Sequence, residues 1–478
     1  MKHDFDVVVI GGGAAGLFAV SVAVALGAKT CMIEKNKLGG DCTLFGCVPS
    51  KAILKSAKVA SIFNRLSDFG LKLKNQSGLD ATDVMAHVRS IVEEISAHHS
   101  PEVFEKRGIK VIFGPSRFLN KNTLEVNEKK ISAKKFIICT GSHPLIPPIE
   151  GLRDVDYLTN ENVFGLETLP KSLIVLGGGP IGLELAQSLH RLGVKVYVIE
   201  AMDRILSRED KEISDFLMAS LEKEGLGILT GDKVIKFEEK EGKHCVVFKS
   251  KDGHKGEISA DSLLVAVGRA PNIDDLGLNQ ARVSYDGKGI KVNAYLQTSN
   301  ENIFACGDVV GPYMFSHVAA YQASICVRNA IFRKIAWQKV NYQNIAWATF
   351  TDPEVSRLGL TEDQAKEQYK EIKVYKSEYT SSDRAVTDSE REGLVKIITD
   401  KKGLILGAHI VGAKASEIIQ GLLVAKSLKQ PLSKIASVLF IYPTLSEIIK
   451  KTAAKPLMAK MDNPLVKFLM KMLNANES

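Results

Sequence analysis

Cysteine is scarce in this chain, which has seven in 478 residues. An odd and sparse count argues against a secreted protein held together by disulfides. We therefore expect a reducing, cytoplasmic setting, in which any disulfide would serve chemistry rather than stability. Two of the seven nevertheless lie close together, Cys42 and Cys47 in the segment GGDCTLFGCVPSK.

Long apolar runs are also missing from the sequence. Stretches such as VSVAVALGA are too short to cross a bilayer, because a spanning helix needs about 20 apolar residues. The opening MKHDFDVVVIGGG enters a strand-like run at once, without the charged region and apolar core of a signal peptide. We expect neither a transmembrane helix nor secretion.

Neither sign of charge dominates. The chain has 63 Lys and Arg against 55 Asp and Glu, a formal net charge of +8 that is scattered along the sequence. A nucleic-acid partner is therefore not expected. With 45% hydrophobic residues the chain can bury a large core, but at this length it should divide into two to four domains.

Glycine, in contrast, is concentrated in two segments of the same form. DVVVIGGGAAGLFAV and SLIVLGGGPIGLELA each place an apolar run before a glycine cluster and a helix-like continuation. Both have the spacing G-x-G-x-x-G, which is met by Gly11, Gly13 and Gly16 and again by Gly177, Gly179 and Gly182. An acid follows 18 residues after the last glycine of each set, Glu34 in the first and Glu200 in the second.

These two patterns predict two dinucleotide sites. The first glycine permits a tight turn, the second lets the backbone approach a pyrophosphate, and the third lets helix and strand pack closely. The acid accepts hydrogen bonds from ribose hydroxyls, and the carboxylate of Glu200 would repel a 2′-phosphate, which favours NADH over NADPH. Arg204 lies near enough in sequence to weaken that preference. Two redox dinucleotides in one chain suggest electron transfer between them.

The rest of the chain follows a coarse order. Residues 54–108 are mostly helical in pattern, and a strand-rich stretch ends near 143 in FIICTGSHPLIPPIEG, where three prolines indicate a domain exit. The second glycine-motif domain runs to about 272. From about 343 the composition changes to alternating strand-like runs followed by helices from 415, which predicts a further α+β domain.

Seven motifs occur in an order that resembles the FAD-dependent pyridine nucleotide-disulfide oxidoreductases, the family of dihydrolipoamide dehydrogenase, glutathione reductase and mercuric reductase. They are GGGAAG, GGDCTLFGCVPSK, CTGS, GGGPIGLELA, VGRAPN, ACGDV and YPTLSE. The resemblance implies an α/β fold with two Rossmann-like domains, for FAD and NAD, and a C-terminal α+β dimerisation domain of a homodimer. The implied boundaries are 1–147 and 273–342 for FAD, 148–272 for NAD(P) and 343–478 for dimerisation.

The resemblance also implies roles for the two cysteines. Cys47 would lie against the flavin as the charge-transfer thiolate, and Cys42 would be the exposed interchange thiol that attacks substrate. A helix start at this point would lower a thiol pKa. A buried or zinc-bound pair stays open as the alternative, although zinc would need further ligands and the next histidine is His87.

Other implied roles concern the cofactors. Lys51 would sit near the flavin N5 region and Glu184 would pair with it, tuning hydride transfer from nicotinamide. The remaining implied FAD-binding residues are Gly11, Gly13, Gly16, Glu34, Thr140, Gly141, Asp308 and His317, and the implied NAD-binding residues are Gly177, Gly179, Gly182, Glu200 and Gly268. The resemblance also implies that the backbone amides of Ser316 and His317, at a helix start, point at the flavin pyrimidine ring. For the His317 side chain we keep a second interpretation, because a histidine at a helix start is also typical of capping or packing.

One position departs from the best-known relatives. In dihydrolipoamide dehydrogenase and glutathione reductase the last motif begins with a histidine that acts as the acid–base for the dithiol, but here it begins with Tyr442. No histidine follows His409. A phenol with a pKa of about 10 is a poor proton shuttle at neutral pH.

Mercuric reductase is similar at this place, with a tyrosine followed by Thr and Glu at the spacing of Thr444 and Glu447. A soft metal ion that accepts electrons needs no histidine base. Those enzymes also use a C-terminal cysteine pair, whereas this chain has no cysteine after Cys326, and we expect no N-terminal metal-binding domain.

The C-terminal segment 464–473 predicts an amphipathic helix. Leu465, Phe468, Leu469 and Met472 recur at helical spacing, with Lys467 and Lys471 off that stripe. An ordinary helix packed on the dimer explains this pattern, and contact with a membrane is the alternative.

Three functions follow in order. The first is a flavoenzyme that oxidises NAD(P)H and reduces a disulfide or soft-metal acceptor through Cys42 and Cys47. The second is a dihydrolipoamide dehydrogenase that tolerates Tyr442. The third is an electron-transfer or binding component that keeps the flavin fold, with possible membrane association, although such a component has no need of the cysteine pair.

Overall fold

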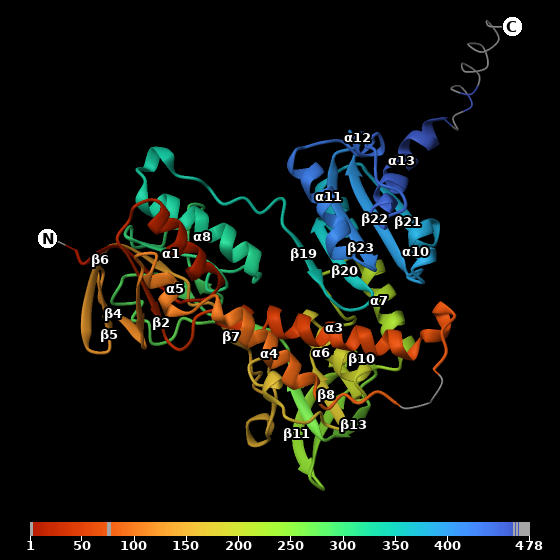
Figure 1. Cartoon of the computed structure of the whole chain (residues 1–478), viewed down its shortest axis with the longest axis horizontal. Helices are drawn as coiled ribbons and strands as arrows, with labels where there is room; N and C mark the ends of the chain where they lie inside the picture. The colour runs from red at the N-terminus through yellow and green to blue at the C-terminus, as the bar shows by residue number, and fades with distance from the viewer. Residues whose placement is uncertain (1–2, 74–77, 462–463, 465–466, 468–478) are drawn as a thin grey trace, which may run out of the picture.

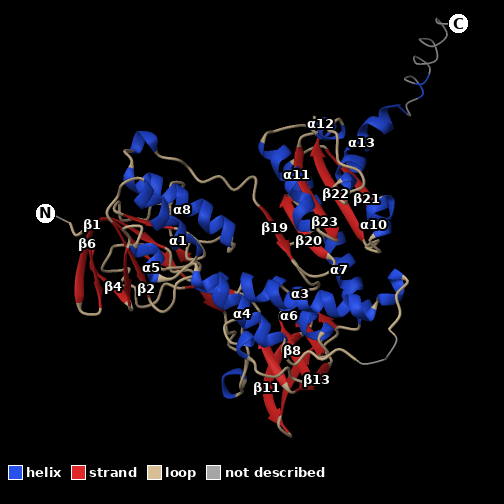
Figure 2. Ribbon diagram, in the orientation of Figure 1, coloured by secondary structure: helices blue, strands red, loops and turns tan. Residues whose placement is uncertain are grey.

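The computed structural model describes residues 3–73, 78–461, 464 and 467, and three main sheets organise them (Figures 1 and 2). The helices are α1 Ala14–Ala25, α2 Gly40–Leu44, α3 Cys47–Asn64, α4 Val84–Ala97, α5 Pro101–Glu105, α6 Pro180–Arg191, α7 Lys211–Glu224, α8 Ser316–Ile331, α9 Glu362–Gln368, α10 Asp383–Thr387, α11 Ala415–Ser427, α12 Leu432–Ala436 and α13 Glu447–Met461.

The first sheet has seven strands and joins two distant parts of the sequence. Its order is β3-β2-β1-β6-β5-β4, with β18 paired to β6. The strands are β1 Phe5–Ile10, β2 Thr30–Glu34, β3 Lys110–Phe113, β4 Ser116–Asn120, β5 Thr123–Val126, β6 Lys129–Ile138 and β18 Ile303–Ala305. Because β18 lies beside β6, the segment after it arrives at the same sheet edge as the first glycine motif.

Burial on both faces explains the continuous apolar run of β1. Val7 and Val9 pack with residues of α1 and α8, while Val8 and Ile10 pack with the β4–β6 side. A parallel strand covered on both faces reads as unbroken hydrophobic sequence rather than as an alternation. The strand then ends at Ile10, and Gly11 takes a left-handed conformation with φ of 105°.

The second sheet repeats this arrangement on a smaller scale. Its four parallel strands have the order β10-β9-β8-β14, and a three-stranded antiparallel sheet, β11-β12-β13, accompanies it. The strands are β8 Ser172–Leu176, β9 Lys195–Glu200, β10 Gly227–Thr230, β11 Lys233–Lys240, β12 Lys243–Lys249, β13 Lys255–Ala260 and β14 Ser262–Val265.

The chain passes between these two units twice, at the same place. The outgoing strand β7, Ser142–Pro144, pairs antiparallel with the returning strand β15, Arg269–Pro271. This small ribbon brings the CTGS and VGRAPN motifs side by side. The second unit is therefore an insertion into the first, and both of its connections lie next to the site described below. A further short pair, β16 Tyr285–Asp286 and β17 Gly289–Ile290, follows.

The third sheet is antiparallel and belongs to the C-terminal part. Its order is β19-β20-β23-β22-β21, with strands β19 Ala346–Thr349, β20 Glu354–Gly359, β21 Ile372–Glu378, β22 Gly393–Asp400 and β23 Ile405–Gly412. Apolar residues of α11 and α13 pack into its core. The predicted α+β unit thus has the expected alternating strands followed by helices.

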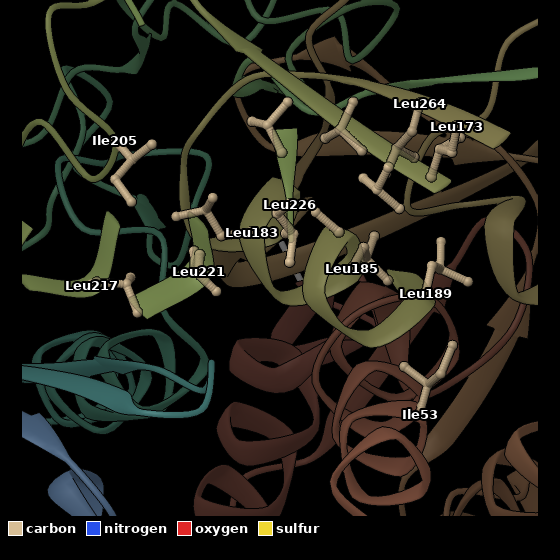
Figure 3. Close-up of a cluster of buried hydrophobic side chains, with 14 of the residues drawn as sticks. Ile53, Leu173, Leu183, Leu185, Leu189, Ile205, Leu217, Leu221, Leu226 and Leu264 are labelled. Carbon is tan, nitrogen blue, oxygen red and sulfur yellow. The ribbon is translucent and has the colours of Figure 1, made fainter. Parts of the chain in front are cut away.

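One hydrophobic cluster connects all three units. It contains Ile53 of α3, Leu185 and Leu189 of α6, and residues of the third sheet such as Val355 and Leu394. Figure 3 shows Ile53 pointing toward the α6 side chains. Since burial of a leucine or isoleucine side chain stabilises by about 1.5–3 kcal/mol, this cluster holds α3 and α6 in fixed relation.

Within the described residues no helix is both long and apolar enough to cross a bilayer. The predicted tail stripe of Leu465, Phe468, Leu469 and Met472, together with Lys471, lies outside the described residues. The described span of α13 is Glu447–Met461.

Candidate active site

The first glycine motif forms a cradle at the end of β1. A Cβ at Gly11 would lie 2.3 Å from the carbonyl oxygen of Cys139, and a Cβ at Gly16 would lie 1.8 Å from the carbonyl oxygen of Gly11. A Cβ at Gly13 would meet nothing nearer than 3.7 Å. The first and third glycines are therefore required by close backbone packing, whereas the second leaves room for a ligand.

The acid of this motif is fixed against the same turn. The carboxylate of Glu34 accepts hydrogen bonds from the backbone N–H of Gly12 at 2.6 Å and of Asn36 at 2.8 Å. A carboxylate held in this way at the rim of a glycine turn is positioned to accept further hydrogen bonds from ribose hydroxyls.

The second motif has the same construction. A Cβ at Gly177 would lie 2.5 Å from the carbonyl oxygen of Ala266, one at Gly182 would lie 2.1 Å from that of Gly177, and one at Gly179 would meet nothing within 4 Å. The carboxylate of Glu200 accepts hydrogen bonds from the N–H of Gly178 and of Met202, each at 2.7 Å. Residues of both motifs fit a dinucleotide, since each leaves its middle glycine open at a helix N-terminus.

A single cleft of about 3020 Å³ connects the two motifs. Its wall includes both glycine turns, both clustered cysteines and the first residues of α8. Ordinary ligand pockets measure about 300–1,000 Å³, so this cleft has room for two dinucleotides end to end.

The two cysteines lie at neighbouring helix ends. Cys42 is in α2 and half-buried, Cys47 is the first residue of α3 and exposed, and the other five cysteines are buried. Both thiols stand on the cleft wall, Cys47 at the point where α3 begins, and the expected roles, with Cys47 against the flavin and Cys42 as the interchange thiol, stay a prediction. In the described part of the chain, no group of three or more His, Cys, Asp or Glu is placed to hold a metal ion.

The two thiols have different acidities. The hydrogen bond from the Cys42 thiol lowers the pKa of Cys47 to about 6, and the Ser316 hydroxyl and Lys51 act in the same direction against burial. The same hydrogen bond and burial raise the pKa of Cys42. Cys47 is therefore the sulfur that loses its proton first.

Lys51 and Glu184 meet although they are far apart in sequence. The ammonium of Lys51 lies 2.7 Å from one carboxylate oxygen of Glu184, and the other oxygen accepts the backbone N–H of Phe350 at 2.9 Å. The Lys51 ammonium also lies 4.3 Å from the centre of the Phe350 ring. Residues from α3, α6 and the segment after β19 thus fix this ion pair close to Cys47.

A second polar cluster surrounds Asp308. The Ser142 hydroxyl donates to the Asp308 carboxylate at 2.6 Å, and burial raises the pKa of Asp308 while this bond opposes the shift. Arg269 donates to the Ser142 hydroxyl at 2.7 Å and its guanidinium lies 3.1 Å from Asp41. Sequence reasoning missed Ser142 and Arg269 as site residues, although both lie inside the CTGS and VGRAPN motifs.

Thr140 and Gly141 are held by the returning chain. The Thr140 hydroxyl donates to the carbonyl of Asn272 at 2.7 Å, and the Asn272 amide donates to the carbonyl of Thr140 at 2.8 Å. Gly268 lines the cleft with φ of 143°, a conformation that favours glycine. Asn272 was also missed, because its partner lies 132 residues away.

The His317 side chain makes a hydrogen bond and an aromatic stacking contact. Its Nε2 lies 2.9 Å from the carbonyl oxygen of Ala346, its ring stacks on Phe315 at 5.6 Å, and burial lowers its pKa. These contacts support the packing interpretation of this histidine. The side chain nevertheless lines the cleft beside Ser316.

Tyr442 and Glu447 are not brought to the cysteines within one chain. Tyr442 is 64% exposed and its hydroxyl donates to Asp383 at 2.9 Å, which raises the pKa of the phenol. Glu447 is the first residue of α13. Leu439 and Ile441 beside Tyr442 are 91% and 79% exposed, so an apolar segment on the surface surrounds the tyrosine.

Comparison with known proteins accounts for two glycine motifs, a cysteine pair and a C-terminal antiparallel sheet in one chain. The pyridine nucleotide-disulphide oxidoreductase profile matches residues 5–323, and the dimerisation-domain profile of the same family matches residues 345–453. The chain belongs to the pyridine nucleotide-disulphide oxidoreductase family. It is an oxidoreductase whose family binds FAD and a nicotinamide cofactor, and the expected α/β fold with a C-terminal dimerisation domain is confirmed.

Individual relatives have different names. A mercuric reductase of Bacillus cereus is 35% identical over 94% of this chain and 71% of its own length. A dihydrolipoyl dehydrogenase of Rhizobium etli is 34% identical over 94% of this chain and 98% of its own. The solved Cu(II) complex of the HOCl-induced flavoprotein disulfide reductase RclA from Escherichia coli matches with a TM-score of 0.83 and 27% identity, covering 95% of this chain and all of that one.

Proposed function

We propose that this chain oxidises NAD(P)H and passes the electrons through FAD to a Cys42–Cys47 disulfide, and from there to a disulfide or soft-metal acceptor. The observation that carries the proposal is the placement of both thiols on the wall of the cleft that joins the two glycine cradles. When bound, the nicotinamide supplies a hydride and FAD relays its two electrons to sulfur.

Lys51, Glu184 and the two cysteines would each have a separate role in this reaction. Lys51 and its buried partner Glu184 place a fixed positive charge beside Cys47, which stabilises negative charge there. Cys47, with the lower pKa, would be the sulfur nearer the cofactor. Cys42, with the raised pKa, would hold the thiol proton and release it as its sulfur attacks the acceptor disulfide or binds the metal ion.

The boundaries 1–147 and 273–342 for FAD, 148–272 for the nicotinamide and 343–478 for dimerisation form part of this proposal. NADH is the proposed donor, because the Glu200 carboxylate at the rim of the second glycine turn would repel a 2′-phosphate. Arg204 also lines the cleft and weakens this preference, although its guanidinium donates to the carbonyl of Ser207 at 2.9 Å.

The acceptor is the part on which the relatives differ. A homodimer in which Tyr442 of one subunit reaches the other subunit's cysteines would place a phenol, and no histidine, at the dithiol. Because a phenol of raised pKa is a poor proton shuttle, a metal-ion acceptor is favoured over lipoamide. The mercuric reductase name of one relative and the Cu(II) complex of the structural neighbour support this order.

Dihydrolipoamide oxidation is the second candidate, supported by the full-length match to the Rhizobium etli enzyme. A flavin-fold component without dithiol chemistry is the third. The free and mutually polarised thiols on the cleft wall argue against it.

The test is steady-state NADH oxidation with mercuric ion, copper(II), lipoamide and glutathione disulfide, using wild type and Cys42→Ser. We expect Cys42→Ser to lose about 100-fold or more in turnover with the true acceptor, because the nucleophilic sulfur is removed. Cys245→Ser is the matched control, since that buried cysteine lies in β12. Full activity of Cys42→Ser with every acceptor would overturn the dithiol path.

A further inference from the structure

Two helix N-termini meet at the Cys47 sulfur. Cys47 is the first residue of α3 and Ser316 is the first residue of α8, and the Ser316 hydroxyl oxygen lies 3.5 Å from the Cys47 Sγ. Neither helix has a side-chain cap, because the preceding residues, Gly46 and Phe315, make no capping hydrogen bond. The Cys47 sulfur therefore lies beside the first residues of two helices, whose N-terminal ends carry partial positive charge.

The other groups near this sulfur are engaged elsewhere. Lys51 is paired with Glu184 at 2.7 Å. Asp41, whose negative charge opposes thiolate formation, accepts from Asn160 at 2.9 Å and lies 3.1 Å from the Arg269 guanidinium. The Ser316 hydroxyl lies within reach of both thiols: it is 3.5 Å from the Cys47 Sγ and also bonds to Cys42, where it lowers the pKa against the larger effects that raise it.

Aromatic packing fixes the residue that carries this hydroxyl. The Phe315 ring stacks on Trp347 at 5.6 Å and 19°, and on the other side of Ser316 the His317 imidazole stacks on Phe315 and bonds to the carbonyl of Ala346. Both neighbours of Ser316 are thus held against the segment around β19. A hydroxyl on such a support keeps its position when the charge on sulfur changes.

We propose that Ser316 is a catalytic residue of the dithiol centre, whose hydroxyl donates a hydrogen bond to Cys47 and stabilises it as the thiolate. The inference rests on the proposed electron path. With FAD as the relay, the hydride equivalent from NAD(P)H would supply two electrons and one proton, and the Cys42–Cys47 S–S bond would break to give one thiolate and one thiol. Cys42 then holds the thiol proton, Cys47 holds the negative charge, and the Ser316 proton stays on oxygen while it points at that sulfur.

This role makes the hydroxyl more important than the size of the side chain. Ser316→Ala removes the donor and leaves α8 with a good helix former at its first position. Ser316→Thr keeps the donor. Ser50→Ala is the matched control, because the Ser50 hydroxyl lies in the same neighbourhood but donates to the Cys47 carbonyl at 3.4 Å and accepts from Lys51 at 3.3 Å.

The experiment measures how the alkylation rate of Cys47 by iodoacetamide depends on pH. It uses the flavin-loaded enzyme in a Cys42→Ser background, where the five cysteines other than Cys47 are buried, and peptide mass analysis identifies the alkylated residue. The groups that face the sulfur in this background are Lys51, Asp41, Ser316 and the hydroxyl that Cys42→Ser introduces, and all of them except Ser316 are the same in the parent and in Ser316→Ala. We expect Ser316→Ala to lower the acid dissociation constant of Cys47 by about three- to tenfold, the effect of one hydrogen bond to a charged group.

In Ser316→Thr the acid dissociation constant of Cys47 should stay within about twofold of the parent value, and in Ser50→Ala it should equal the parent value. A second readout, the charge-transfer absorbance of the reduced enzyme with Cys42 intact, should appear at a correspondingly higher pH in Ser316→Ala. The role assigned to Ser316 would be overturned if the midpoint of the alkylation–pH curve were unchanged in Ser316→Ala, or if it moved by the same amount in Ser50→Ala. Failure of the electron path would instead appear as acceptor turnover that survives Cys42→Ser, whatever the midpoint shows.

Discussion

At the scale of single residues, two cysteines of the same segment are chemically different. Local sequence predicted their importance from their spacing, and the resemblance supplied the roles of Lys51 and Glu184. The contact between Cys47 and Ser316 could not be predicted, since 269 residues separate them and neither lies in a pattern that points to the other. The contact depends on how two helices are placed, which no local signal carries.

The difference in acidity leads to a prediction on pH. Because the pKa of Cys47 is lowered to about 6, the reduced enzyme should hold a thiolate above that pH and lose it as the pH falls through about 6. An ordinary cysteine would lose its charge near 8.5. The folded reduced state is accordingly stabilised by this group above pH 8.5, and that stabilisation disappears toward pH 6.

Charge-transfer absorbance of the two-electron-reduced enzyme, recorded from pH 5 to pH 9, measures this directly. Lys51→Met should move the midpoint upward, since it removes a positive charge that lowers the pKa. A wild-type midpoint at the ordinary cysteine value would contradict the assigned acidity.

At the scale of elements, the glycine motifs were predictable because their requirements are local. A tight turn with positive φ and a close helix–strand approach leave glycine as the suitable residue, so the spacing alone indicated both cradles. The ribbon of β7 and β15 was not predictable, because its two strands lie 127 residues apart and are three residues long.

The two kinds of glycine position can be separated by experiment. Gly179→Ala places its Cβ in open space on the cleft wall, so the free energy of unfolding should fall by less than about 1 kcal/mol while the KM for NADH rises. Gly182→Ala places its Cβ 2.1 Å from a backbone oxygen, so unfolding should become easier by about 3 kcal/mol. Denaturant unfolding and NADH kinetics on both variants check this, and equal losses of stability would contradict it.

At the scale of the whole molecule, ion pairs connect the three units. Asp352 accepts from Arg191 at 2.8 Å and from Lys58 at 3.2 Å, and Arg191 also pairs with Glu224. Burial raises the pKa of Asp352, but the Arg191 and Lys58 charges outweigh it and leave the pKa lowered. Sequence analysis predicted the units but not this junction, because its members come from helices and loops of all three.

The exposed apolar segment around Tyr442 leads to a prediction about dimerisation. The apolar segment around Tyr442, with Leu439 91% exposed, belongs to the dimerisation domain of the family. Isolated folded chains rarely leave such large side chains clustered in water, so we expect a second subunit to cover them. Leu439→Asp should therefore produce a monomer, because an unpaired carboxylate would be buried at the interface.

Leu439→Asp also tests whether acceptor turnover needs the dimer while flavin binding and flavin reduction do not. The monomer should keep its flavin and its NADH-dependent flavin reduction, since both cradles lie within one chain, but it should lose acceptor turnover if Tyr442 of the partner subunit completes the site. Ile335→Asp, at a position 97% exposed outside the dimerisation domain, is the matched control and should remain dimeric. Light scattering and acceptor kinetics measure both properties, and a Leu439→Asp monomer with full acceptor turnover would place the whole reaction within a single subunit.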